Sequence, residues 1–210
     1  MSAVHASIMR VHFGPIPETP DFMPQPPWRA LKEPTPWLMQ LLAVPVAVVS
    51  GGGILALWSW RTPLKAVVLD PQFMAWGLAA FIWLIPVHEA VHALVHPGRG
   101  LSDRTCIGLW LSRGMFYAHC HGPMSRNRFI AILIAPFIVL SILPLIVSAL
   151  TGWMHPLPVT GSVVNAFLAC GDLLGVLLIV WQIPRDAMIQ NQAWRTYWQS
   201  SPVASQLEHG

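Results

Sequence analysis

The residues best suited to chemistry form the motif HEAVH at positions 88–92. In a helix, His88 and His92 lie four residues apart on one face, so both imidazoles can bind one metal ion. Glu89 follows the first histidine, where it can take a proton from a metal-bound water molecule. Zinc suits imidazole and carboxylate ligands and lowers the pKa of its bound water to about 7. The motif therefore predicts a zinc site in which Glu89 is the general base of peptide-bond hydrolysis.

A catalytic zinc site needs a third protein ligand beside the two histidines. Four further residues are candidates for it: His96, His119, His121 and Asp172. His96 lies eight residues beyond His88, which is about 12 Å along a regular helix and too far for the two to share an ion. His119 and His121 alternate along a predicted strand, so both side chains would point to the same face and could reach a metal.

The composition indicates an integral membrane protein. Of the 210 residues, 54% are hydrophobic and only 10% are charged, whereas a typical soluble domain has about 25% charged residues. A bilayer can solvate such an apolar exterior, and this length suffices for one membrane domain without a second globular domain. The net charge of +3 is not gathered into a basic run, so no nucleic-acid partner is expected.

Four apolar stretches are long enough to cross a hydrocarbon core of about 30 Å as helices. They run over 37–60, 73–96, 128–150 and 161–184. Residues 1–36 carry eight prolines and should form an extended cytoplasmic arm on or near the membrane rather than a packed element. The predicted fold is an all-α membrane protein, with about four transmembrane helices in a domain over 37–184 and a cytoplasmic or interfacial tail over 185–210.

Lysines and arginines are distributed unevenly between the two sides of this arrangement. Ten of the twelve lie in the arm, in the loop after the second stretch and in the tail. The other two, Arg61 and Lys65, lie on the opposite side. By the positive-inside rule, both termini and the 99–127 loop should be cytoplasmic. The expected location is the cytoplasmic membrane of a bacterium.

The loop between the second and third stretches differs from a simple connection. Two β-like runs, 107–111 and 115–121, flank the turn residues 112–114 and predict a short hairpin. A two-stranded hairpin alone is marginally stable, so it should lean on the membrane helices. A strand beside the metal could pair with a substrate unwound from its helix. An ordinary cytoplasmic loop is the alternative.

Depth within the membrane favours Asp172 as the third ligand. The second and fourth stretches are both expected to enter the membrane from outside. Counted from Phe73, His88 lies about 22 Å along the second stretch. Counted from Gly161, Asp172 lies about 17 Å along the fourth, at nearly the same depth. Asn165 precedes Asp172 by seven residues, or two helical turns, and so faces the same way. An Asn–Asp pair that joins neighbouring helices through hydrogen bonds is the alternative explanation.

The order of these features resembles that of known membrane proteases. HExxH in one span, a hairpin loop, another span and an aspartate in the next are similar to the three-span core of the site-2 protease (M50) intramembrane metalloproteases. More closely, HEAVHAL, the loop after it and NAFLACGD resemble the DUF3267 family of small membrane zincin peptidases, over about residues 75–190. The sequence departs from the site-2 protease pattern because Gly171 precedes Asp172 and no proline separates Asp172 from Asn165.

The resemblance implies a role for each matching residue. Zinc would be bound by His88, His92 and Asp172, with Glu89 as the base. Asn165 would have a supporting or substrate-orienting role. Fold and metal site are expected to carry over from the family more securely than proteolysis.

The leading hypothesis is a membrane-embedded zinc metalloprotease that cuts membrane or membrane-proximal protein substrates. Its expected partners are such a substrate and the lipid bilayer, and no oligomeric state is inferred. One alternative is a non-proteolytic metal- or haem-binding membrane protein that uses His88, His92, His119 and His121. Haem needs axial imidazoles on opposite sides of one ring, whereas HExxH puts two on one face. Another alternative is an inactive protease-like scaffold that binds substrates without cutting them.

Overall fold

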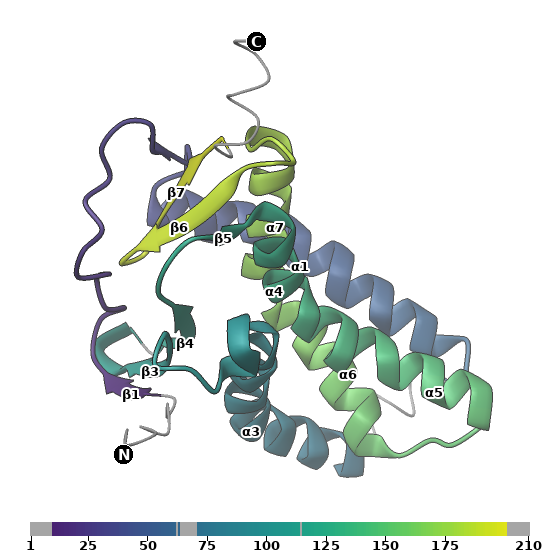
Figure 1. Ribbon diagram of the computed structural model, residues 1–210. Helices are drawn as coiled ribbons and strands as arrows, with labels where there is room; N and C mark the ends of the chain where they lie inside the picture. Colours follow the sequence, from purple (N-terminus) through teal and green to yellow (C-terminus); the bar gives the residue numbers. More distant parts are fainter. Residues whose placement is uncertain (1–9, 62, 64–70, 114, 201–210) are drawn as a thin grey trace. The chain divides into compact units, whose positions relative to one another are not determined.

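The structure, a computed structural model, describes residues 10–61, 63, 71–113 and 115–200. Within these ranges the chain is mostly helical and carries two small sheets (Figure 1). It divides into two compact units, which are described separately. The helical unit comprises Pro34–Val91 and Leu133–Leu177, and the sheet unit comprises the described residues of 1–33, 92–132 and 178–210.

Among the described residues, three helical segments are long and apolar enough to cross a membrane: Trp37–Ser59, Met74–Val95 and Arg126–Thr151. They correspond to α1 (Pro36–Ser59), α3 (Pro71–Val95) and the continuous run of α4 (Arg126–Pro136), the π-helical turn η3 (Phe137–Ile142) and α5 (Leu143–Thr151). A fourth candidate is a bent pair, α6 (Pro156–Leu168) and α7 (Cys170–Gln182), with 47° between the two helices. These three to four spans agree with the number predicted from the sequence.

The fourth candidate span differs from the single helix expected over 161–184. Its first helix, α6, begins earlier, at Pro156, a residue well suited to the first helical turn. His155 caps this turn, because its Nδ1 accepts a hydrogen bond from the backbone N–H of Leu157 at 3.2 Å. The break at Ala169 then puts Asn165 in α6 and Asp172 in the first turn of α7. The two residues expected on one helix therefore come from two.

The third span is interrupted at its middle by the π-helical turn. Prolines lie just before the turn, at Pro136, and just after it, at Pro144. Each proline lacks the N–H that a regular helix would donate to the fourth residue back, so the helical ladder is loosened there. The N–H of Leu143 bonds instead to the carbonyl of Ile138, five residues back.

Close packing of α1 on α6 forms the core of the helical unit. The buried residues of this core are Ile54, Trp58, Val159 and Ala166. A Cβ at Gly51 would lie 2.5 Å from ring atoms of Phe167, so only glycine allows this approach. Beside it, the hydroxyl of Ser50 donates to the carbonyl of Ala166 at 2.7 Å.

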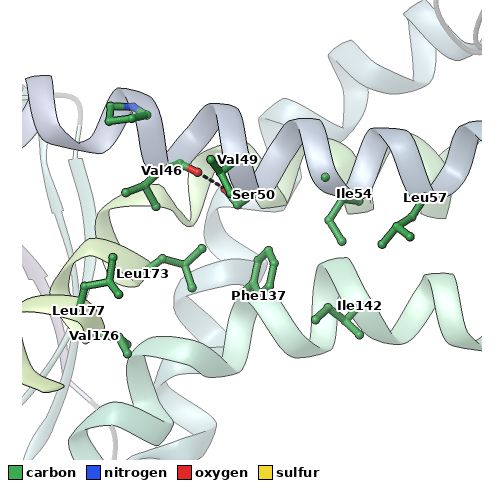
Figure 2. A pocket seen from close by; sticks show the side chains of 12 residues that line it. Val46, Val49, Ser50, Ile54, Leu57, Phe137, Ile142, Leu173, Val176 and Leu177 are labelled. Atoms are coloured by element: carbon green, nitrogen blue, oxygen red, sulfur yellow. Dashed lines mark hydrogen bonds between the residues drawn. The ribbon is translucent and has the colours of Figure 1, made fainter.

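An apolar groove of about 670 Å³ runs between α1, the π-helical turn and α7 (Figure 2). Its lining is apolar except for Ser50, whose hydroxyl also contacts the carbonyl of Val46 at 2.8 Å. One wall includes Leu173, the neighbour of Asp172 in the sequence, and another includes Phe137. The groove therefore flanks the segment that carries the predicted third ligand.

The sheet unit holds two sheets. The first has the order β1-β3-β4, in which β1 (Arg10–Phe13) runs parallel to β3 (Thr105–Trp110), and β3 pairs antiparallel with β4 (Met115–Cys120). A short 3-10 helix, Leu111–Arg113, follows β3, and another, Pro97–Gly100, follows α3. The second sheet has the order β2-β7-β6-β5, from β2 (Arg29–Ala30), β7 (Arg195–Gln199), β6 (Met188–Gln192) and β5 (Met124–Ser125).

These sheets make the prediction of an all-α protein only approximate. The strands β3 and β4 lie in the segment where the sequence predicts a hairpin, although its turn residue Gly114 lies outside the described residues. The hairpin of β6 and β7 in the tail was not predicted. Its two strands are joined by Ala193 and Trp194, and each also pairs with a distant strand, β7 with β2 and β6 with β5.

The proline-rich segment is packed in part, contrary to the prediction of an unpacked arm. Phe22 and Leu31 are buried. The ring of Phe22 packs edge-to-face against Trp28 and Tyr197, with ring centroids 5.0 and 5.9 Å apart. Aromatic side chains of the arm and the tail therefore pack against each other. The division into arm, transmembrane domain and tail stays a prediction.

Candidate metal centre

The last two turns of α3 carry the HEAVH motif. His88 and His92 are buried, with 7% and 6% of their surface exposed, and Glu89 is half-buried. The boundary between the two units falls between Val91 and His92, inside this unbroken helix. One turn of α3 therefore fixes the position of His92 relative to His88, and both side chains share a face.

Asp172 joins the two histidines. The ligand atoms of His88, His92 and Asp172 all lie within 4.8 Å of one another. His88 Nε2 and Asp172 Oδ2 are 2.9 Å apart. Ligand atoms of a tetrahedral zinc ion, at bond lengths of about 2.0–2.2 Å, are roughly 3.3–3.5 Å apart. The distances between the ligand atoms of the three residues, from 2.9 Å to at most 4.8 Å, span this value. Two imidazoles and one carboxylate are also a typical donor set for zinc, so the group could hold a metal ion.

Asn165 contacts His88 on its other ring nitrogen. This fully buried side chain places Oδ1 2.8 Å from His88 Nδ1. Its Nδ2 donates to the carbonyl of Pro136 at 3.0 Å and to the hydroxyl of Ser141 at 2.8 Å. A carbonyl can only accept, so the amide orientation is fixed and Oδ1 must accept a proton from His88 Nδ1. Nδ1 therefore carries a proton, and the 2.9 Å contact of Nε2 with Asp172 Oδ2 holds a second one, which a metal ion would displace on binding to Nε2.

His92 is held in the same way by a backbone group. Its Nδ1 lies 2.8 Å from the carbonyl oxygen of Ile132 in α4. The carbonyl accepts, so Nδ1 carries the proton and Nε2 is the nitrogen suited to a metal. Histidines that bind metals usually donate their other N–H to a carbonyl or carboxylate. His88 and His92 therefore both fit the pattern of metal-ligating residues.

His96 lies outside this group, as its spacing predicts. It follows α3, is 2% exposed, and its backbone carbonyl accepts a hydrogen bond from Arg128 at 3.1 Å. Burial, with a smaller contribution from the positive charge of Arg128, lowers the pKa of His96 to about 4. This imidazole is therefore neutral at physiological pH.

His119 and His121 form a pair of their own in the sheet unit. Their ring centroids are 4.7 Å apart and their planes nearly perpendicular; His119 lies in β4, and His121 follows its last residue. His121 Nδ1 also lies 3.2 Å from the hydroxyl of Thr19. Burial is the main cause that lowers the pKa of His119 to about 4. The group of three potential ligands contains neither histidine.

Three residues that contact the site were not predicted: Ile132, Pro136 and Ser141. Ile132 and Pro136 act through backbone carbonyls, which leave no mark in side-chain type. Ser141 is a polar residue within an apolar span and is fully buried. Its polarity in that setting was the one signal that could have indicated a contact with the site.

Comparison with known proteins gives one match. The model of a family described as "Putative zincin peptidase" (DUF3267) matches residues 81–188. The matched segment includes the HEAVH motif, Asn165 and Asp172. Neither the curated proteins nor the solved structures gave a match to the chain.

Proposed function

The chain belongs to the zincin peptidase family DUF3267, whose model covers just over half of its 210 residues, and on that basis we propose that it is a membrane-embedded zinc metalloprotease. Its substrates would be membrane or membrane-proximal proteins, cut by hydrolysis of a peptide bond. The observation that carries the proposal is the group of His88, His92 and Asp172, which adjoins Glu89 on α3. The similarity to site-2 proteases stays a prediction.

Each residue of the site has a distinct role in this proposal. His88, His92 and Asp172 hold the metal, and Asn165 keeps His88 in the orientation that binding needs. Zinc, when bound, polarises the scissile carbonyl and makes water a better nucleophile. Glu89 accepts a proton from the attacking water and passes it to the leaving amine. A metal carrier or a haem protein would have no use for this carboxylate.

The strand β4 supports a mode of substrate binding. It lies at the edge of the sheet β1-β3-β4, so its outer backbone groups face away from β3. An extended substrate segment could add to this edge as a further strand. The hydrogen bonds of the added strand would give affinity with little dependence on substrate sequence.

The proposal is tested by a search for cleavage products. Membranes from cells that produce the wild-type chain should contain new peptide termini that are absent when His88→Ala is produced, because this variant lacks a metal ligand. Mass spectrometry of protein termini provides the measurement. Identical sets of termini from both membranes would contradict proteolysis in those cells.

The distribution of charge predicts the topology. Ten of twelve lysines and arginines fall on one side, so both termini and the 99–127 loop would be cytoplasmic, in the cytoplasmic membrane of a bacterium. Lys65, one of the two opposing charges, lies outside the described residues. With the native cysteines replaced by serine, Arg10→Cys and Arg195→Cys should resist an impermeant thiol reagent applied to intact cells.

Trp153→Cys is the matched control for this labelling. Trp153 is exposed between α5 and α6, on the side predicted to face outwards, and its cysteine variant should react readily. Labelling at Arg10→Cys or Arg195→Cys as fast as at Trp153→Cys would reverse the assignment of sides.

A further inference from the structure

Pro136, in the middle of the third span, lies at the junction between α4 and the π-helical turn. In a regular helix the carbonyl of Ile132 would accept the N–H of the residue four positions later. That residue is Pro136, which has no N–H. The Ile132 carbonyl thus lacks its helical donor and instead receives the Nδ1 proton of His92, at 2.8 Å.

The π-helical turn has a matching effect on His88. Pro136 and Ser141 are five residues apart, and in an α-helix they would lie about 140° apart around the axis. A π-turn pairs residues five apart and so brings both onto one face. The Pro136 carbonyl and the Ser141 hydroxyl can then both accept from Asn165 Nδ2, at 3.0 and 2.8 Å. Asn165 Oδ1 is thereby turned towards His88.

A second chain of hydrogen bonds holds the turn itself. Trp58 Nε1 donates to the hydroxyl of Ser162 at 3.0 Å, and this hydroxyl donates to the carbonyl of Ser141 at 2.7 Å. Trp58, Ser162, Ser141 and Asn165 are all essentially fully buried in the helical unit. In so apolar a setting a hydrogen bond has few competitors, so the amide of Asn165 has one stable orientation.

We infer that Pro136 and the turn after it are the device by which the third span sets the tautomer of both histidines in the proposed metal centre. Pro136 lacks an N–H, which leaves the Ile132 carbonyl available to His92. Its own carbonyl accepts from Asn165, which in turn contacts His88. Each imidazole keeps its proton on Nδ1 and presents the Nε2 lone pair to a metal. Pro136 and Ser141 are positioning residues in this inference, which rests on the proposed function.

Pro136→Ala tests the His92 branch because it should separate metal affinity from stability. Alanine restores an N–H that competes with His92 for the Ile132 carbonyl. Loss of such an outer contact typically lowers metal affinity about 10–100-fold. The melting temperature of the metal-free protein should stay the same or rise, since alanine suits a helix better than proline. Zinc titration against a chelator of known affinity, in the full-length protein in detergent, measures the first quantity.

Ser141→Ala tests the His88 branch by removal of one acceptor from Asn165. Zinc affinity should fall about ten-fold here as well. NMR of the metal-free protein with isotopically labelled histidine provides a readout that a general packing defect would not change. Wild-type protein should show His88 and His92 protonated at Nδ1. Pro136→Ala should add a form of His92 without the Nδ1 proton, and Ser141→Ala should add such a form of His88.

Two control variants match these changes. Pro45→Ala replaces a proline inside α1, and Ser148→Ala replaces a serine that is 1% exposed in the same span as Ser141. Both should retain wild-type affinity and tautomers. The inference would be overturned if zinc affinity fell equally in each variant and its control. Unchanged histidine tautomers in Pro136→Ala and Ser141→Ala would also overturn it. If wild-type protein binds no zinc, the proposed function fails, while the tautomers of the metal-free protein still decide this inference.

Discussion

Glu89→Gln should keep about one zinc ion per chain, as in the wild type, and lose two to four orders of magnitude in turnover. The glutamine is nearly isosteric with the glutamate but cannot accept the proton of the attacking water. Glu89 is not among the three residues whose ligand atoms converge, so the donor set is unchanged. Metal analysis of the purified variant and cleavage of a membrane substrate found with wild-type protein provide the two measurements.

Glu18→Gln is the matched control, because it makes the same change at an exposed residue of the arm. It should retain both zinc and turnover. Zinc loss in Glu89→Gln would make this glutamate a ligand or a structural residue. Wild-type turnover in Glu89→Gln would exclude Glu89 as the base and so contradict the proposed mechanism.

Local patterns were sufficient to predict much of the candidate site. The four-residue spacing of His88 and His92 works within a single helix, so no tertiary information was needed to place both on one face. Asp172 could be identified because a carboxylate inside an apolar span is costly and needs a partner. Its proximity to the histidines followed from a comparison of depths along two spans, which the bilayer makes possible.

The contacts around the ligands were less accessible from the sequence. Ile132 and Pro136 act through their backbone carbonyls. The Ile132 carbonyl can accept from His92 because Pro136, four residues later, has no N–H to donate to it. The bend at Ala169 was also missed, because no proline or glycine occupies that position. It matters for the site, since it divides Asn165 and Asp172 between two helices.

The number of spans was predictable from hydropathy alone, but the sheets were not. A membrane helix satisfies its backbone hydrogen bonds within itself, so a long apolar run is enough to identify it. The strands of the arm depend on partners far away in the sequence, as when Arg29 lies opposite Trp198. Such pairing depends on tertiary contacts that short-range patterns do not contain.

Asp172→Ala should reduce zinc occupancy of the purified protein to a small fraction of the wild-type value and abolish turnover. The change leaves two imidazoles, which is one ligand short of a catalytic zinc site. It also removes the carboxylate 2.9 Å from His88 Nε2. Because ligand atoms and metal bind together, each lost ligand lowers affinity steeply. Metal analysis after dialysis against a weak chelator measures the occupancy.

Two further variants distinguish loss of a ligand from loss of charge. Asp172→Glu keeps a carboxylate at the start of α7 and should restore part of the zinc occupancy, whereas Asp172→Asn keeps the shape and should not. Asp186→Ala, which removes an exposed aspartate just after α7, should bind zinc as the wild type does. Full occupancy in Asp172→Ala would remove Asp172 from the site. In that case the same measurement on His119→Ala and His121→Ala would show whether either of these histidines supplies the third ligand.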